Sequence, residues 1–255
     1  MGTNKLYSIL ILCFVFCVFN FNAQNKIDAN GRKQGPWVKY YPDIKIPQYR
    51  GQFVDDKPVG EFYYFHPTGE VRAIIEHIPN SLRSYATYYH KNKEVMSEGA
   101  FWNQKKDSVW THFDAEGLIT EVEEYKNDQL NGRKQTFFIE TQRESGKLQV
   151  LTISYYKDNQ LHGDFKEFFS NGKLKKQGKF ESGNRVGEWV EYNLNGQLVG
   201  KVRYKNGLVH GWAYGYDAKG NVVKETLYMD GVILEGKDRE TYLDFCKKKG
   251  IDPNQ

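Results

Sequence analysis

Residues 187–196 read GEWVEYNLNG, and this stretch decides the fold. Its first half is rich in aromatic and β-branched residues, which is typical of a β-strand. The Asn-Leu-Asn-Gly segment that ends it is typical of a tight turn, where glycine adopts a positive φ that other residues avoid. The following residues, 197–204, lead to a further aromatic residue, Tyr204. The stretch and its continuation therefore predict a β-hairpin.

The same layout recurs about every 24 residues along the chain. The units begin at Gly35, Gly60, Ser84, Ser108, Gly132, Gly163, Gly187 and Gly211, and Gly236 closes the series. An aromatic residue stands five positions after every start, at Tyr40, Phe65, Tyr89, Phe113, Phe137, Phe168, Tyr192 and Tyr216. Such periodicity indicates a repeat protein whose neighbouring units stack on one another. We therefore expect an all-β fold, an elongated and twisted antiparallel sheet of about eight tandem β-hairpin repeats.

Three segments divide the chain. Residues 1–23 read as a signal peptide, because Lys5 precedes a short apolar run and Ala23 offers a small residue for cleavage. An uncleaved membrane anchor is the alternative. Residues 24–236 form the predicted repeat domain, and residues 237–255 form a capping helix and tail. The leader predicts an exported protein that is periplasmic, outer-membrane-associated or secreted.

The short C-terminal helix is expected to begin at Asp238 and to end at Lys249. We expect it to cover the last edge of the sheet, where unpaired backbone groups would otherwise invite aggregation. Tyr242, Phe245 and Cys246 share one of its faces. Cys246 is the one cysteine outside the leader, so we expect no internal disulfide, and a thiol buried against the sheet is favoured over a reactive one.

The charge balance excludes a nucleic-acid binder. The formal net charge is +4, from 36 Lys and Arg against 32 Asp and Glu, and the two signs are interspersed. The longest basic run, at residues 247–249, is too short to select an anionic membrane by itself. We therefore expect no nucleic-acid partner.

Known catalytic and metal-binding signatures are absent from the sequence, including the nucleophile elbow, the phosphate loop and the His-Glu-x-x-His helix. His66 and His90 hold equivalent places in adjacent units, which puts their backbones about 10 Å apart. His162 and His210 are two units apart, at about 19 Å. Because zinc requires ligands about 2 Å from the ion, we expect solvated turn histidines and no metal site.

The carboxylates lead to the same expectation. Glu121 and Glu123 share a strand face, and Glu188 lies near Glu191. Paired acids on an exposed sheet are ordinary solvated residues unless a pocket raises one pKa. The sequence therefore predicts no catalytic residue, no cofactor-binding residue and no metal ligand, and the protein is expected not to be an enzyme.

The rings of the repeat are expected to be structural anchors rather than ligand-stacking platforms, although docking of carbohydrate or peptide is an alternative. The anchors are Trp37, Tyr40, Phe65, Trp110, Phe113, Phe168, Trp189, Tyr192 and Tyr216. Apolar and aromatic residues fall on both parities of the strands, so both faces of the sheet are expected to carry rings.

The fifth unit carries seven extra residues, which we expect at the exposed tip of a lengthened hairpin. They are Thr141, Gln142, Arg143, Glu144, Ser145, Gly146 and Lys147. Loops of this kind carry recognition in many proteins, and they are also places where insertions are tolerated without a function. Both interpretations stay open.

Two stretches, GEWVEY at residues 187–192 and GPWVKY at residues 35–40, resemble the bacterial variant of MORN repeats. The resemblance covers about residues 31–236. It implies an elongated sheet that acts as a scaffold or attachment surface, and some relatives carry an antitoxin label. We therefore expect a non-enzymatic scaffold of the cell envelope that binds an envelope protein. The alternatives are a surface that attaches to a membrane or to cell-wall glycan, and an antitoxin-like binding protein.

Overall fold

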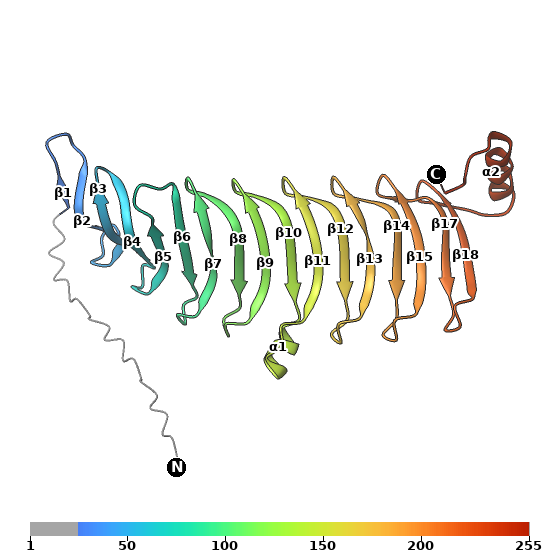
Figure 1. Cartoon of the computed structure of the whole chain (residues 1–255), viewed down its shortest axis with the longest axis horizontal. Coiled ribbons are helices and arrows are strands. Elements are labelled where there is room, and N and C mark those ends of the chain that lie inside the picture. Colours follow the sequence, from blue (N-terminus) through green and yellow to red (C-terminus); the bar gives the residue numbers. More distant parts are fainter. Residues whose placement is uncertain (1–24, 255) are drawn as a thin grey trace, which may run out of the picture.

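A computed structural model describes residues 25–254. Nineteen strands form one open antiparallel sheet in which nearly all consecutive strands pair (Figure 1). The predicted signal peptide, or anchor, at residues 1–23 lies outside the described residues. Neither of the two helices in the described part of the chain is long and apolar enough to cross a membrane.

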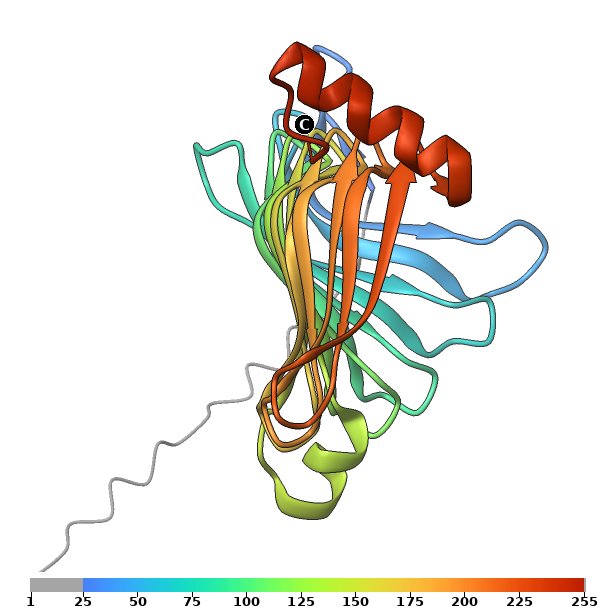
Figure 2. The ribbon, with the colours of Figure 1, turned by 90° about the vertical axis from the view of Figure 1, so that its right-hand side faces the viewer.

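Eight hairpins follow one another along the sheet, as the sequence predicts. They are β2 (Lys33–Tyr40) with β3 (Pro47–Val54), β4 (Lys57–Phe65) with β5 (Val71–His77), β6 (Arg83–Tyr89) with β7 (Val95–Trp102), β8 (Lys105–Phe113) with β9 (Ile119–Lys126), β10 (Gln129–Phe137) with β11 (Val150–Lys157), β12 (Gln160–Phe168) with β13 (Leu174–Glu181), β14 (Asn184–Tyr192) with β15 (Leu198–Lys205), and β17 (Gly211–Tyr216) with β18 (Val222–Met229). Three short strands, β1 (Lys26–Ile27), β16 (Leu208–Val209) and β19 (Val232–Leu234), complete the sheet. The N-terminal hairpins splay away from the C-terminal ones, so the sheet is twisted (Figure 2).

The glycine that begins a unit marks a β-bulge. Gly187 has φ of +65°, and the ladder between β13 and β14 shifts register beside it, between Gln177 and Lys179. A bulge adds residues to one strand and requires a left-handed backbone, which glycine adopts without the Cβ clash. The periodic glycines are therefore fixed by backbone geometry.

Serine replaces the starting glycine in two units, with different consequences. Ser108 keeps the left-handed backbone, at φ of +63°, and is exposed. Ser84 is buried and does not share this conformation, because the ladder between β5 and β6 runs without a register shift. The third unit has therefore lost the bulge, whereas the fourth has kept it under strain.

Ser108→Gly is expected to raise the free energy of unfolding by roughly 0.5–1 kcal/mol. Relief of the left-handed strain exceeds the extra chain entropy of glycine in the unfolded state. Ser84→Gly is the matched control, and it should lower stability because a strand interior disfavours glycine. Urea unfolding of both variants measures the difference, and stabilisation by both would disprove this account of the bulge.

One face of the sheet, which we name the ring face, carries the buried aromatic row. Residues at the third position of a unit form its centre, and Trp110 and Trp189 are 0% and 2% exposed there. Each indole lies on a glycine of the preceding strand, Gly99 or Gly178, where a Cβ would overlap the ring. A glycine opposite a large ring thus creates the space that the ring fills.

A volume rule, by which the sizes of paired side chains complement each other, applies to the central row of the ring face. In six units the third-position side chain packs beside the residue eleven positions earlier, and a large side chain pairs with a small one. The pairs are Phe62 with Gly51, Trp110 with Gly99, Phe165 with Ser154, Trp189 with Gly178, Ala86 with Ile75, and Ala213 with Val202. Pairing a large side chain with a small one avoids both overpacking and a cavity at these positions.

The predicted anchors fall into three classes of exposure. Trp110 and Trp189 are buried, and Tyr40 is 55% exposed. The others are half-buried, namely Trp37, Phe65, Phe113, Phe168, Tyr192 and Tyr216. Most rings five positions after a unit start are thus partly solvated, and the ladder register shows rings on both faces of the sheet.

The helix α2 (Gly236–Lys249) begins two residues before the position that the sequence predicts. Its N-cap is Glu235, so Asp238 lies in the first turn and is not the cap. Cys246 is buried, as expected, whereas Phe245 on the predicted buried face is 50% exposed. The helix lies across the ends of the last strands (Figures 1 and 2).

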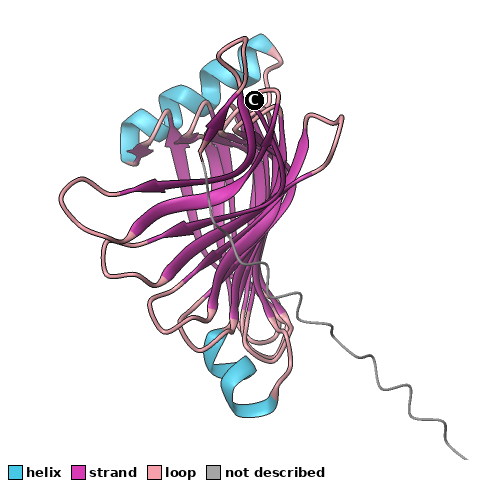
Figure 3. Ribbon diagram, turned by 90° about the vertical axis from the view of Figure 1, so that its left-hand side faces the viewer, coloured by secondary structure: helices cyan, strands magenta, loops and turns pink. Residues whose placement is uncertain are grey.

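The two edges of the sheet are treated differently. At the N-terminal edge (Figure 3), the Asn25 side-chain amide donates to the Val38 carbonyl at 2.8 Å and accepts from the Val38 N–H at 2.8 Å. This side chain therefore substitutes for a neighbouring strand. At the other edge, β19 pairs only with residues 227–229 of β18. The predicted cap is thus incomplete, and residues 222–226 of β18 have no outer partner strand among the described residues.

Candidate functional site

The ring face is the candidate binding surface. Apart from strands, the elements within residues 25–254 are α1 (Ile139–Ser145) and α2, and both lie at strand ends (Figure 1). Three local features interrupt the regular row of rings on or beside this face. They are an ion cluster in the fifth unit, the helix α1, and a hollow near the C-terminal end.

The ion cluster replaces the buried ring of the fifth unit. Lys134 holds the third position, and its partner eleven residues earlier is Glu123, which is 5% exposed. The Lys134 ammonium lies 2.7 Å from Glu123 and 2.7 Å from Glu121. Tyr125 donates to Glu123 at 2.9 Å, and His112 Nε2 lies 3.2 Å from the same carboxylate. The expectation that Glu123 is a solvated acid is therefore wrong, because strand register places it between a ring and a lysine.

Mutual contacts shift the pKa values in this cluster. Burial raises the pKa of Glu123, but contacts with His112, Lys134 and Tyr125 outweigh it and lower that pKa to about 2. Burial and the hydrogen bond to Glu123 raise the pKa of Tyr125 to about 12. Burial lowers the pKa of Lys134, but the hydrogen bonds to the two carboxylates raise it above its usual range. The cluster therefore holds an ammonium between two carboxylates at neutral pH.

The low pKa of Glu123 predicts acid sensitivity. A carboxylate with a lower pKa in the folded state contributes stability fully above its unfolded pKa, and this is lost as pH falls through the folded pKa. Stability should therefore decline between about pH 5 and about pH 2, by roughly 3 kcal/mol from this group. Urea unfolding across that range measures the slope. Glu123→Gln should flatten it, whereas the exposed control Glu144→Gln should leave it as steep as in the natural chain.

A metal ion could find three ligand atoms in the same cluster. Ligand atoms of His112, Glu121 and Glu123 all lie within 4.8 Å of one another. Both carboxylates, however, already share the ammonium of Lys134. A cation would have to displace that ammonium, so the side chains present fit an internal ion pair better than a metal site.

The four histidines considered as possible metal ligands from the sequence lie apart from this cluster. His66, His90 and His162 are half-buried, and His90 Nε2 lies 3.1 Å from the Phe113 carbonyl. His210 is 6% exposed and lies 2.9 Å from Asp230, so the expectation of a solvated turn histidine is wrong there.

The acids Glu188 and Glu191 do not meet. The ladder register places them on opposite faces of β14. Glu188 forms an ion pair with Lys201, and Glu191 lies 2.6 Å from Lys176. The neighbourhood in sequence therefore does not create a carboxylate pair in space.

The seven-residue insertion is helical and packs against the preceding hairpin. Residues 139–145 form α1, and Gly146 ends it in a left-handed conformation. Gln142 is 9% exposed, and its side chain donates to the Ile119 carbonyl at 2.7 Å and accepts from the Ile119 N–H at 3.1 Å. Arg143 lies 2.8 Å from Glu116. The expectation of an exposed loop is therefore wrong for Gln142, and α1 has a structural task.

Gln142→Ala is expected to lower the free energy of unfolding by roughly 1–3 kcal/mol. The change leaves the N–H and carbonyl of Ile119 without their partners at a partly buried place. Glu144→Ala, at an exposed position of the same helix, is the matched control and should change stability little. Thermal unfolding compares the two, and equal midpoints for both variants would show that α1 is a passive insertion.

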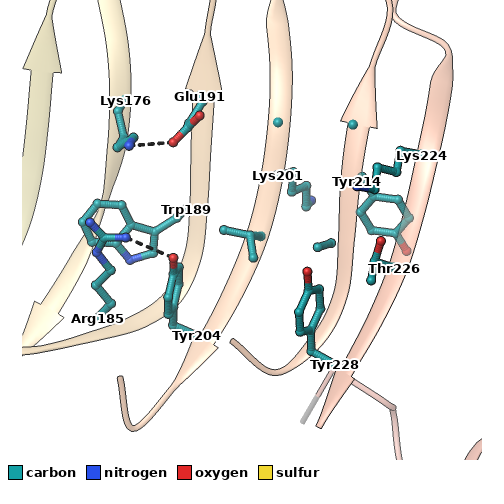
Figure 4. Close-up of a pocket in the computed structure, with 14 residues that line it drawn as sticks. Lys176, Arg185, Trp189, Glu191, Lys201, Tyr204, Tyr214, Lys224, Thr226 and Tyr228 are labelled. Carbon is teal, nitrogen blue, oxygen red and sulfur yellow. Dashed lines mark hydrogen bonds and ion pairs between the residues drawn. The ribbon is translucent and has the colours of Figure 1, made fainter. Parts of the chain in front are cut away.

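The hollow lies on the ring face between β14 and β18 (Figure 4). Its volume is about 280 Å³. Gly200 and Gly215, which are direct partners in the ladder, form its floor. Figure 4 shows the Lys176–Glu191 ion pair at one side and Lys224 at the other. Because glycine has no side chain, these two positions on adjacent strands leave a gap in the row of side chains.

Rings and small polar groups complete the walls of the hollow. Tyr204 and Tyr228 border it, and Arg185 donates to the Tyr204 hydroxyl at 3.0 Å. Arg185 also stacks on the Trp189 ring at 4.5 Å from its centroid. Sequence reasoning did not identify this hollow. The signal was Gly200 and Gly215 at strand positions where neighbouring units carry larger side chains.

Comparisons with known proteins bear on the repeats and less on the rest of the chain. No curated protein matches the sequence. Among solved structures, TarM is similar at 16% identity and a TM-score of 0.28, over 42% of this chain and 20% of that chain. A complex of mutant S. aureus TarM with fondaparinux, α-GlcNAc-glycerol and UDP is similar at 11% identity and a TM-score of 0.26, over 50% of this chain and 19% of that chain.

Those structural likenesses are too weak to carry an argument, and the chain spans about a fifth of the length of each protein. The family profile described as MORN repeat variant matches residues 161–182 and 185–206. These two segments correspond to the sixth and seventh hairpins, β12 with β13 and β14 with β15. The chain therefore contains tandem MORN repeats of the variant type, and they form consecutive hairpins of its sheet.

Proposed function

We propose that this protein is a non-enzymatic scaffold of the cell envelope that binds another protein through its ring face. The observation that carries the proposal is the open ring face, which no helix covers along the described strands. A sheet of this number of strands extends for on the order of 80 Å, because adjacent strands are about 4.8 Å apart. Repeat arrays commonly use such long surfaces for binding.

The composition of the surface favours a protein partner over a lipid surface. Aromatic rings are enriched where proteins meet, and the ring face carries charges of both signs in ion pairs such as Lys134–Glu123 and Lys176–Glu191. An anionic membrane would select a cluster of basic residues instead. The envelope location rests on the predicted leader at residues 1–23, with a periplasmic, outer-membrane-associated or secreted protein as the consequence.

Site-specific crosslinking in producing cells tests the proposal. A photoreactive amino acid at Thr152 would probe the ring face, and the same group at Ile153 would probe the opposite face of β11. We expect a protease-sensitive crosslinked species from position 152 and little from position 153. Crosslinks that resist protease would indicate glycan or lipid instead. Equal yields at both positions, or none at either, would contradict the ring face as the binding surface.

A further inference from the structure

The ring face repeatedly builds one three-part contact. Trp110 lies on Gly99, and the Lys106 ammonium lies 4.3 Å from the centroid of its ring. Trp189 lies on Gly178 in the same way, and Arg185 stacks over it. Each contact thus consists of a glycine floor, an aromatic ring and a cation above the ring.

The hollow contains the floor of this contact without the ring. A Cβ at Gly99 or Gly178 would overlap an indole, whereas a Cβ at Gly200 would meet only the Glu191 Cβ, at 3.9 Å. Gly215, the ladder partner of Gly200, extends the floor over a second strand. The backbone at Gly200 and Gly215 is therefore open to a ring from outside.

A cation stands beside the same floor. Lys224 pairs with Gly215 in the ladder, and a Cβ at Gly215 would lie 3.3 Å from the Lys224 Cβ. Among the described residues, no hydrogen bond or ion pair engages the Lys224 ammonium. Lys176, on the other side, is already paired with Glu191. Lys224 is thus available to a ring placed on the floor.

We propose that the hollow receives an aromatic side chain of the partner protein, which lies flat on Gly200 and Gly215 beneath Lys224. The inference rests on the proposed function, since it assigns the recognition chemistry of the same face. The volume of about 280 Å³ accommodates the side chain of tryptophan, tyrosine or phenylalanine. An inserted ring would complete the contact that Trp110 and Trp189 form within the chain.

Titration of the isotope-labelled full chain with short peptides tests this inference. The probes are the peptides Gly-Gly-Trp-Gly-Gly and Gly-Gly-Leu-Gly-Gly, followed through backbone amide signals. We expect the tryptophan peptide to shift the signals of Gly200, Gly215 and Lys224 at millimolar concentration, and the leucine peptide to shift them at least about tenfold less effectively. Equal effects of the two peptides, or no shift at these three residues, would overturn the inference.

Gly200→Val provides a variant that fills the hollow without harming the fold. Its backbone has no positive φ, the added side chain meets open space, and valine suits a strand. The midpoint of unfolding should stay the same or rise, while affinity for the tryptophan peptide should fall at least about tenfold. Arg203→Val places the same valine side chain on the opposite face of β15 and should retain affinity.

Lys224→Gln tests the cation separately. It should lower the affinity for the tryptophan peptide several-fold. Lys219→Gln, in the exposed turn before β18, should leave that affinity unchanged. Unchanged affinity in Gly200→Val would place the ring elsewhere. If the peptides do not bind but crosslinking at position 152 succeeds, only the role of the hollow in binding a ring is refuted. If the peptides bind but no protein is crosslinked, only the scaffold function is refuted.

Discussion

Trp110→Ala is expected to lower the free energy of unfolding by roughly 3–5 kcal/mol. The side chain is fully buried, its indole N–H donates to the Ala100 carbonyl at 3.0 Å, and its ring meets Phe101 edge-on at 5.1 Å. Removing it opens a cavity over Gly99 and removes a donor. Tyr192→Ala is the comparison, and it should cost clearly less because that ring is half-buried. Urea unfolding of the two variants at neutral pH measures both losses.

A second substitution shows whether the volume rule explains the loss. Gly99→Val alone should also be strongly destabilising, because its Cβ would overlap the indole. Gly99→Val combined with Trp110→Ala would copy the natural pair of Val202 and Ala213. The double variant should therefore be more stable than the sum of the two single losses predicts. Additive losses would show that the paired positions do not share one packing space.

The hairpins could be predicted from the sequence because their signals are local. Gly196 and the residues around it determine the turn, and the periodic starts exemplified by Gly187 require a left-handed backbone within a bulge. Neither needs knowledge of distant residues. The same bulges, however, shift the alternation of the strands. The aromatic residues five positions after each start are therefore conspicuous in the sequence. The buried tryptophans, however, stand two positions after the start of their units.

The features that sequence reasoning missed depend on contacts between strands. Glu123 and Lys134 are eleven residues apart, and only the ladder register shows that they face one another. Gln142 reaches Ile119 across 23 residues, so an insertion that resembled a loop is a docked helix. The hollow likewise requires Gly200 and Gly215 to become neighbours. Each feature is visible in the sequence as a departure from the repeat pattern, but the contacts that it makes can be found only from the strand register.

Lys134→Ala is expected to be about as damaging as loss of a buried tryptophan, at roughly 3–5 kcal/mol. The substitution leaves the buried Glu123 carboxylate without its closest cation, and Glu121 faces it. The pKa of Glu123 should rise as a result, so the variant should lose less stability than the natural chain when the pH is lowered. Unfolding at two pH values distinguishes this charge effect from a simple loss of packing, which would not depend on pH.

The ion pair and the ring pairs should be exchangeable, because both occupy the same two positions of the repeat. Glu123→Ser combined with Lys134→Phe copies the neighbouring pair of Ser154 and Phe165, which the sheet already accommodates one hairpin further along. Replacement of a buried ion pair by well-packed apolar groups is often neutral or stabilising. The double variant should therefore recover most of the stability that Lys134→Ala loses. It should also show a flatter pH dependence, because the carboxylate with the low pKa is gone. If it is as unstable as Lys134→Ala, the ion cluster has a structural role that a ring cannot replace, and the repeat columns are less interchangeable than their shared geometry suggests.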